Sequence, residues 1–294
     1  MARKLARREA IEGYAFILPW IIGYSVLIIG PVVVSIYCGF TNYDLIKAEF
    51  IGLQNYVEIF ADSLFWKSLK VTLIYAGASV SLLLSLGLAI ALLMNQKLKG
   101  IVVFRTIYYL PAVIAGIAAS LMWIWLFNGP FGLINFVLEK VGISGPDWLS
   151  SQKWALPAII MVTSWRVGAS MLIYLAGLQN IPTELYEAST IDGAGVWVRF
   201  TKITLPMLSP VLFFNLIIGT INSFQIFTEP YVMTTGGPNY ATYVYALYIY
   251  DSALIYGKFG FATALSTILL IVILSLTLGM FKLSKGFVFY RGIS

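Results

Sequence analysis

Residues 181–210 read IPTELYEASTIDGAGVWVRFTKITLPMLSP and form a polar interruption between two long apolar runs. The segment opens with a helix-start signal, because Thr183 can cap a helix and Glu184 suits the positive end of its dipole. Glycines at 193 and 195 then permit a sharp reversal, and a second helical run stops at Pro206. We predict a helix, a glycine turn and a second helix between two membrane spans.

The composition is that of a polytopic membrane protein. Of the 294 residues, 60% are hydrophobic and only 11% are charged, whereas about a quarter of a soluble domain is charged. The mean hydropathy of +0.87 agrees with this class. The chain has no histidine and one cysteine, Cys38. These counts exclude imidazole catalysis, histidine metal sites and intrachain disulfides, and we expect no metal site.

Six apolar runs predict an all-α fold of six transmembrane helices. The runs cover residues 14–40, 71–94, 107–127, 154–178, 207–227 and 262–281. We therefore expect a single membrane domain over 14–281, with a helix-turn-helix loop at 182–206. A short N-terminal segment, 1–13, precedes it, and a tail, 282–294, follows.

The basic residues predict the topology. Most lie on the side that holds the termini: Arg3, Lys4, Arg7, Arg8, Lys97, Lys99, Arg105, Arg199, Lys202, Lys282, Lys285 and Arg291. The positive-inside rule then places both termini and the 182–206 loop in the cytoplasm. This clustering beside span ends also argues against a nucleic-acid partner for the net charge of +6. Residues 243–256 are apolar but short, and we interpret them as an outer-face interfacial or re-entrant helix.

The chain offers no energy source of its own. It contains no G-x-x-x-x-G-K-[ST] sequence, so it has no P-loop for ATP. Its acidic residues lie in loops or at span ends, and we see neither a strong internal repeat nor a mid-span acid, which disfavours an ion-coupled secondary transporter. An embedded enzyme is disfavoured too, because no nucleophile–base pair can be assembled. Energy must therefore enter from another protein.

The 182–206 loop is the candidate entry point. Its small residues permit close approach of a partner, and its acids offer contacts to a basic rim. A helix resting on lipid is the alternative, but such helices usually carry a Lys/Arg-rich polar face, and this one is acidic in its first half. The candidate docking residues are Glu184, Glu187, Ala188, Ser189, Asp192, Gly193, Ala194 and Gly195.

Part of this loop resembles a known family. Glu187-Ala188-Ser189, Asp192-Gly193-Ala194, Phe200, Ile203 and Leu205-Pro206 are similar to the cytoplasmic EAA loop of binding-protein-dependent ABC importer permeases, with Ser189 in place of the second alanine. Further stretches resemble the carbohydrate-uptake branch, of the maltose and glycerol-3-phosphate kind: residues 41–43 (TNY), 52–56 (GLQNY), 175–182 (LAGLQNIP) and 235–238 (TGGP).

The resemblance implies a permease subunit of the plasma or inner membrane that is not itself an enzyme. It implies a second homologous permease, two cytoplasmic ATPase subunits and an extracytoplasmic solute-binding protein, besides membrane lipid. ATP and magnesium would be held by the ATPase subunits, with no cofactor on this chain. Residues 187–195 would form the coupling helix, and ATPase closure would rock the permeases between inward and outward states.

A sugar path needs amide and hydroxyl groups and an aromatic platform. The fourth and fifth runs, which supply the sugar contacts in the maltose-importer permease, offer such candidates: Ser164, Trp165, Arg166, Asn222, Ser223, Phe224, Gln225 and Phe227. Arg166 can contact substrate or a gate, or can form a structural pair with a carbonyl or a partner-subunit acid. Two alternatives stay open: an ABC permease for a non-sugar solute, and a secondary transporter or channel.

Overall fold

The computed structural model describes residues 2–96, 98–284, 286 and 288. Lys97, Lys285 and Arg291, used above for topology, lie outside the described residues, as do the side chains of Arg3, Lys4 and Arg8. The chain divides into two compact units, Met1–Asp62 with Ile249–Leu270, and Ser63–Tyr248 with Ile271–Ser294.

Unit one holds the first predicted span and a β-hairpin. Its elements are α1 (Ala2–Tyr24), η1 (Ser25–Ile29), α2 (Gly30–Cys38), β1 (Thr41–Tyr43), β2 (Ala48–Phe50), α3 (Gln54–Ala61), η3 (Asp251–Ile255) and the first half of α15 (Phe259–Ser284). The stretch Ile11–Cys38 is one helix with a mean hydropathy of 2.2, and none of its apolar window is buried within the chain. That helix therefore offers its whole surface to lipid or to another subunit.

The GLQNY stretch has a structural role in unit one. Asn55 is buried, and its Nδ2 donates hydrogen bonds to the carbonyl oxygens of Gly39 and Thr41, both at 2.9 Å. Thr41 begins β1, which pairs antiparallel with β2. The amide thus ties the end of the first span to the hairpin through backbone groups that would otherwise be buried without partners.

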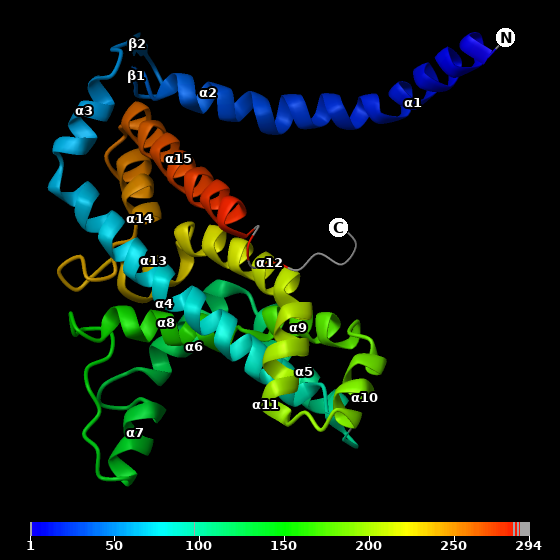
Figure 1. The fold of residues 1–294 in the computed structure, drawn as a ribbon. Helices are drawn as coiled ribbons and strands as arrows, with labels where there is room; N and C mark the ends of the chain where they lie inside the picture. The colour runs from blue at the N-terminus through cyan, green and yellow to red at the C-terminus, as the bar shows by residue number, and fades with distance from the viewer. Residues whose placement is uncertain (1, 97, 285, 287, 289–294) are drawn as a thin grey trace. The chain divides into compact units, whose positions relative to one another are not determined.

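Unit two holds the remaining helices (Figure 1). They are α4 (Ser63–Met94), α5 (Ile101–Val113), α6 (Gly116–Leu126), α7 (Leu133–Lys140), α8 (Ala155–Trp165), α9 (Gly168–Gln179), α10 (Thr183–Ile191), α11 (Val196–Arg199), the π-helical turn η2 (Phe200–Thr204), α12 (Leu205–Phe224), α13 (Thr228–Thr234), most of α14 (Tyr245–Tyr250) and the second half of α15. Helix α4 packs along both α9 and α12.

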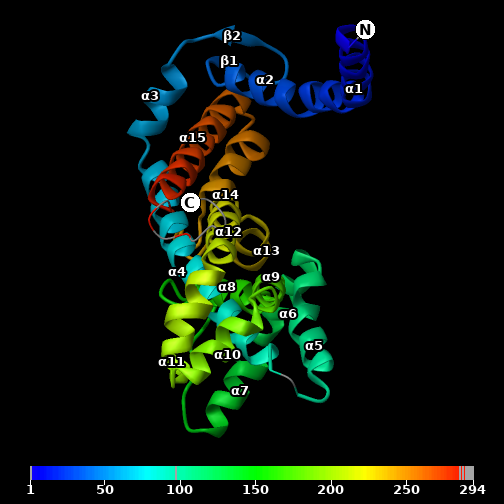
Figure 2. The same cartoon turned by 45° about the vertical axis from the view of Figure 1, so that its right-hand side comes forward.

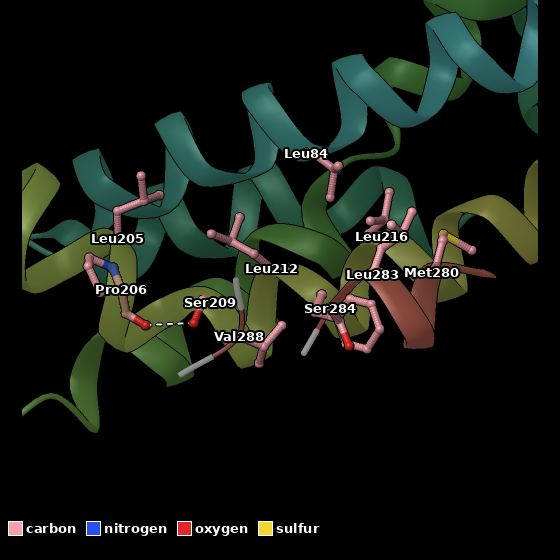
Figure 3. A pocket seen from close by; sticks show the side chains of 11 residues that line it. Leu84, Leu205, Pro206, Ser209, Leu212, Leu216, Met280, Leu283, Ser284 and Val288 are labelled. Carbon is pink, nitrogen blue, oxygen red and sulfur yellow. Dashed lines mark hydrogen bonds between the residues drawn. The ribbon is translucent and has the colours of Figure 1, made fainter. Parts of the chain in front are cut away.

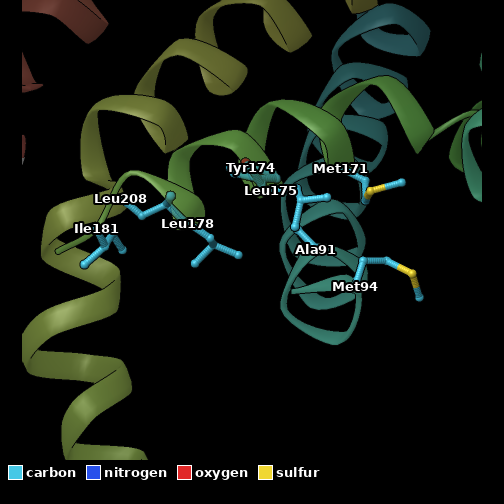
Figure 4. Close-up of a cluster of buried hydrophobic side chains, with 8 residues drawn as sticks. All are labelled: Ala91, Met94, Met171, Tyr174, Leu175, Leu178, Ile181 and Leu208. Carbon is cyan, nitrogen blue, oxygen red and sulfur yellow. The ribbon is translucent and has the colours of Figure 1, made fainter. Parts of the chain in front are cut away.

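The core of unit two lies where α4, α9 and α12 meet (Figure 4). Met171 and Tyr174 of α9, Ala91 of α4 and Leu208 of α12 are fully buried there. Tyr186 of α10 packs against the same cluster. The cluster therefore joins the spans to the first arm of the 182–206 loop.

The predicted all-α membrane fold is confirmed, with one change in its spans. Among the described residues, four helices are long and apolar enough to cross a membrane, and six spans result if each of two bent pairs counts as one. Helices α5 and α6 are bent by 99°, and α8 and α9 by 44° (Figure 2). The bends were not predicted, because hydropathy measures apolar length and not the continuity of backbone hydrogen bonds.

Two details at the 182–206 loop also differ from prediction. Thr183 does not cap α10: Pro182 stands at the N-cap, without a side-chain cap bond. The second run does not end at Pro206, since α11, η2 and α12 form one continuous helix, Val196–Phe224. Pro206 is tolerated because it lies in the first turn of α12, directly after the π-helical turn has shifted the hydrogen-bond register.

The short segment after residue 242 does not qualify as a span. It consists of α14 and η3. The tyrosines of α14 are not an exposed belt, however, since Tyr245 and Tyr248 are buried. The backbone N–H of Tyr245 donates to Thr72 Oγ1 of α4 at 2.8 Å, so this end of α14 is anchored to a long helix.

Candidate functional site

The D-G-A stretch forms a Schellman cap at the end of α10. The N–H of Ala194 donates to the Ser189 carbonyl at 2.9 Å, and the N–H of Gly193 to the Thr190 carbonyl at 3.1 Å. This pattern requires a left-handed residue at the position of Gly193, whose φ is +73°. The predicted glycine turn is therefore present, and glycine is needed there for its backbone conformation.

The candidate docking residues divide by exposure. Glu184, Glu187 and Asp192 are exposed, and so are Ala188, Gly193 and Gly195, while Ala194 is half-buried. Ser189 instead faces its own chain, where its Oγ donates to the Tyr186 carbonyl at 2.8 Å. Of the two small residues in the E-A-S stretch, Ala188 is therefore on the exposed surface and Ser189 faces the interior of the chain.

An apolar group beside the turn was missed in the sequence. Ile191, Val196 and Trp197 are 88%, 77% and 74% exposed, respectively. The sequence could have indicated this group, because three large apolar side chains flank a polar turn. Single exposed apolar residues are ordinary, but a group of them marks an interaction surface. The loop therefore presents an acidic edge together with an apolar group.

The two arms of the loop are braced against each other. Tyr186 Oη and Thr204 Oγ1 are 2.9 Å apart, and Arg199 Nη1 donates to Thr190 Oγ1 at 3.3 Å. The second arm continues into α12 as one helix of 29 residues, roughly 43 Å long at 1.5 Å per residue. A push on the loop therefore acts directly on the membrane part of α12.

A polar cavity lies farther along the same helix, within unit two. It has a volume of about 330 Å³, which is in the range of small-molecule sites. Its polar and charged lining comes from α4, α8, α9, α12 and α13: Tyr75, Ser79, Thr163, Arg166, Ser170, Asn215, Asn222, Ser223 and Glu229.

Most hydroxyls of this lining are paired across helices. Tyr75 Oη and Thr163 Oγ1 are 2.9 Å apart, and Ser79 Oγ and Ser223 Oγ are 3.1 Å apart. Ser170 Oγ donates to Asn215 Oδ1 at 2.8 Å. These bonds fix the helices around the cavity. Asn222, by contrast, is an exposed amide on its wall.

Arg166 lies at the break between α8 and α9 and contacts two other segments. Its Nη1 is 3.2 Å from Glu229 Oε1 of α13, and its Nη2 donates to the Ile114 carbonyl at 3.2 Å. Ile114 stands at the break between α5 and α6. Both hypotheses for Arg166 had a basis: it lines the cavity, and it is paired with a carbonyl and an acid of its own chain.

Glu229 adds a feature that the sequence did not indicate. It lies past the end of α12, as predicted for the acids, but its side chain is only 9% exposed. Two of the spans are also broken. Buried acids and broken helices are features of ion-coupled transporters too, so these features alone do not exclude that class.

The eight residues predicted for the solute path fall into two groups, those that line the cavity and those that do not. Arg166, Asn222 and Ser223 line the cavity. The others do not line it: Ser164, Trp165, Phe224, Gln225 and Phe227. Trp165 packs edge-on against Trp123 with ring centroids 5.7 Å apart, and Phe227 stacks on Tyr231 at 5.1 Å. These aromatic rings are structural contacts in this state.

The missed lining residues follow a helical period that the sequence contains. Positions 215, 219 and 222 recur every three or four residues on α12, and 75, 79 and 83 do the same on α4. Such a spacing places side chains on one helix face. Reading polar residues by face, and not by adjacency, would have found Asn215, whereas Glu229 lies on the separate helix α13.

A second cavity is unsuited to a polar solute. It lies among α4, α12, the end of α15 and Val288, and apolar side chains such as Leu212, Leu216 and Met280 dominate its wall (Figure 3). The Ser209 hydroxyl at its edge already donates to the Pro206 carbonyl at 2.7 Å. The cavity lined by Arg166 and Asn222 is therefore the candidate solute site.

Apolar spans around a polar cavity, joined by one helix to an exposed loop, define a membrane permease. The chain belongs to the family of inner membrane components of binding-protein-dependent transport systems, which matches residues 81–284. Members are permease subunits of ABC transporters, and the predicted class is thus confirmed.

Known relatives agree with this family over nearly the full length. The probable ABC transporter permease protein YesP of Bacillus subtilis is 42% identical and covers 97% of this chain and 94% of its own. The trehalose/maltose transport system permease protein MalF of Thermococcus litoralis is 37% identical over 97% of both chains. A bacterial alginate ABC transporter, in complex with an alginate pentasaccharide-bound periplasmic protein, has a chain of TM-score 0.84 at 25% identity, covering 96% of both.

Proposed function

We propose that this chain is one permease subunit of an ATP-driven importer for a sugar or oligosaccharide. A second homologous permease completes the path, two cytoplasmic ATPase subunits supply energy, and a solute-binding protein delivers the solute. ATP and magnesium are held by the ATPase subunits. Both termini and the 182–206 loop face the cytoplasm, as the distribution of basic residues supports.

The continuous helix Val196–Phe224 carries this proposal. It begins at the exposed docking loop and bears Asn215, Asn222 and Ser223 of the cavity wall. A displacement of the loop by an ATPase subunit therefore reaches the solute site without an intervening hinge. This arrangement explains how a chain without an ATP site can couple to ATP hydrolysis.

The chemistry of the cavity favours an uncharged solute of sugar type. Its wall offers hydroxyl and amide groups, which match sugar hydroxyls. Arg166 is neutralised by Glu229 of the same chain, so a solute carboxylate has to compete for the guanidinium. The relative from Thermococcus litoralis is a trehalose/maltose permease, whereas the alginate transporter handles an acidic glycan.

A solute screen tests the proposed function. The complete complex, with its binding protein, is reconstituted in vesicles, and ATP hydrolysis is measured with maltose, trehalose, an alginate oligosaccharide, an amino acid or no solute. We expect stimulation by an uncharged saccharide. Stimulation by the amino acid alone would establish the non-sugar alternative, and uptake into vesicles that lack ATPase subunits would establish a secondary transporter or channel.

Asn222 is expected to act on solute affinity. The Asn222→Leu variant removes an exposed amide from the cavity wall, and we expect a roughly tenfold higher half-saturating concentration of the stimulating saccharide, about one lost hydrogen bond. The matched control is Gln225→Leu, an exposed amide three positions on that does not line the cavity. Equal effects of the two variants would remove Asn222 from the path.

A further inference from the structure

The guanidinium of Arg166 joins the ends of three helices at the polar cavity. Arg166 itself ends α8, its Nη2 holds the carbonyl of Ile114, which ends α5, and its Nη1 holds Glu229 in the first turn of α13. Gly116, the first residue of α6, lies against the same group, since a Cβ there would be 3.7 Å from Arg166 Nη1 and 3.8 Å from Glu229 Oε1. Both broken spans therefore meet α13 at a single ion pair.

The contacts of this ion pair are incomplete. The distance between Arg166 Nη1 and Glu229 Oε1 is 3.2 Å, longer than the 2.7–2.9 Å that is usual between an ionised donor and an ionised acceptor. Arg166 Nε is buried and has no hydrogen-bond partner among the described residues. A fully satisfied buried pair would be expensive to separate. An ion pair with a long bond and an unused donor still holds the segments together, but separating it costs less free energy than separating a fully hydrogen-bonded pair.

We propose that the Arg166–Glu229 pair is a clasp that opens once in each transport cycle. The proposal rests on the proposed function. The two breaks are the points in these spans where the backbone can change direction without disrupting a helix, because the helical bonds are already interrupted there. Opening the clasp frees α13 from both breaks, with Arg166 left on the Ile114 carbonyl, and widens the cavity wall. Arg166 and Glu229 are positioning residues in this scheme.

A purely static role makes the opposite prediction. If the pair only stabilises the fold, then a covalent link between α6 and α13 beside the pair leaves the cycle unchanged. If the pair must open, the same link stops the cycle. The position of Gly116 offers such a link, because a Cβ at residue 116 would be 3.3 Å from Thr228 Cγ2, so the sulfur of a cysteine at 228 that takes the place of this methyl lies close to a cysteine at 116.

The first test uses a disulfide and does not need a known solute. Gly116→Cys and Thr228→Cys are introduced with Cys38→Ala, which removes the native cysteine. The permease–ATPase complex is oxidised with and without prior trapping by ATP and vanadate, and cross-linking is followed by thiol labelling. We expect trapping to slow cross-linking by at least about fivefold, the lower end of ordinary coupling between sites. We also expect the cross-linked complex to lose basal ATP hydrolysis and regain it with reductant.

The matched control is a disulfide in the outer loop. A Cβ at Gly129 would lie 3.7 Å from Asp147 Cγ, so Gly129→Cys with Asp147→Cys links two loop positions away from the breaks. This link is expected to leave ATP hydrolysis unchanged. The clasp is overturned if the fully cross-linked 116/228 variant hydrolyses ATP at the wild-type rate and if trapping does not change the rate of cross-linking. The proposed function would still stand in that case.

The second test loosens the clasp without removing an acceptor atom. Glu229→Gln keeps Oε1 but loses the charge, and we expect basal ATP hydrolysis to rise by about fivefold or more, because the cycle no longer has to separate an ion pair. Glu58→Gln is the control, since Glu58 pairs with Lys258 at 3.4 Å in an exposed site. An assembled Glu229→Gln complex with unchanged basal hydrolysis contradicts the clasp.

Discussion

Replacing Glu187 by lysine and Gly193 by tryptophan is expected to abolish co-purification of the proposed ATPase subunits. Glu187 is exposed on α10, so the lysine reverses a charge that we assign to the docking surface. No atom lies within 4 Å of a Cβ at Gly193, so the tryptophan projects outward into the partner. A like charge set against a basic rim costs several kcal/mol, and about 3 kcal/mol is roughly a hundredfold in affinity. Affinity capture of the tagged permease followed by quantification of the ATPase measures the result.

An equivalent pair of changes elsewhere provides the control. Glu139 is exposed in α7, and Gly142 has a φ of +80° with no atom within 4 Å of a Cβ, as at Gly193. Glu139→Lys with Gly142→Trp therefore imposes the same charge change and the same left-handed strain, about 1–3 kcal/mol. Normal ATPase capture by the 187/193 variant would refute docking at this loop, whereas loss in both variants would assign the effect to folding.

Gly168→Ala is expected to destabilise the permease by about 3 kcal/mol, the upper end of the usual cost of overpacking. A Cβ at residue 168 would overlap the Tyr108 carbonyl oxygen and lie 2.7 Å from Tyr109 Cα. These atoms belong to the backbone of α5 and cannot rotate away, so α5 and α9 must separate. The measurement is the thermal unfolding of the purified permease in detergent.

The same substitution at Gly77 calibrates the effect. Gly77 lies in α4 with no atom within 4 Å of a Cβ. Gly77→Ala is expected to be neutral or to stabilise the helix by up to about 1 kcal/mol, the difference in helix propensity. A melting temperature that falls equally in both variants would show that contact with α5 is not the reason glycine is required at 168.

The parts of the fold that depend on local composition were predictable from sequence. Apolar length located the membrane-crossing segments, and the D-G-A stretch indicated a turn that Gly193 makes with a φ of +73°. The breaks at Ile114 and Arg166 were not predicted, because each depends on a hydrogen bond between segments about fifty residues apart. The continuity of the helix through Pro206 was likewise hidden, since proline alone indicates an end.

The candidate site was predicted less well than the docking loop, and the reason is geometric. The loop is contiguous, so Glu187 and Asp192 could be placed on a surface from local spacing. The polar residues of the cavity are spread over five helices, and neighbouring residues such as Trp165 and Arg166 end up in different environments. Glu229 follows a Phe-Thr pair at a span end, where an acid is ordinarily solvated, and only the packing of α13 against α6 and α8 buries it.

The ion pair that joins the broken spans also constrains how this sequence can change over generations. Losing Arg166 alone strands a buried carboxylate, and losing Glu229 alone strands a guanidinium at 29% exposure. Each single replacement is thus costlier than the joint replacement of both by an uncharged pair of similar volume. We therefore expect the two positions to be exchanged together among related sequences, even though 63 residues separate them in the chain.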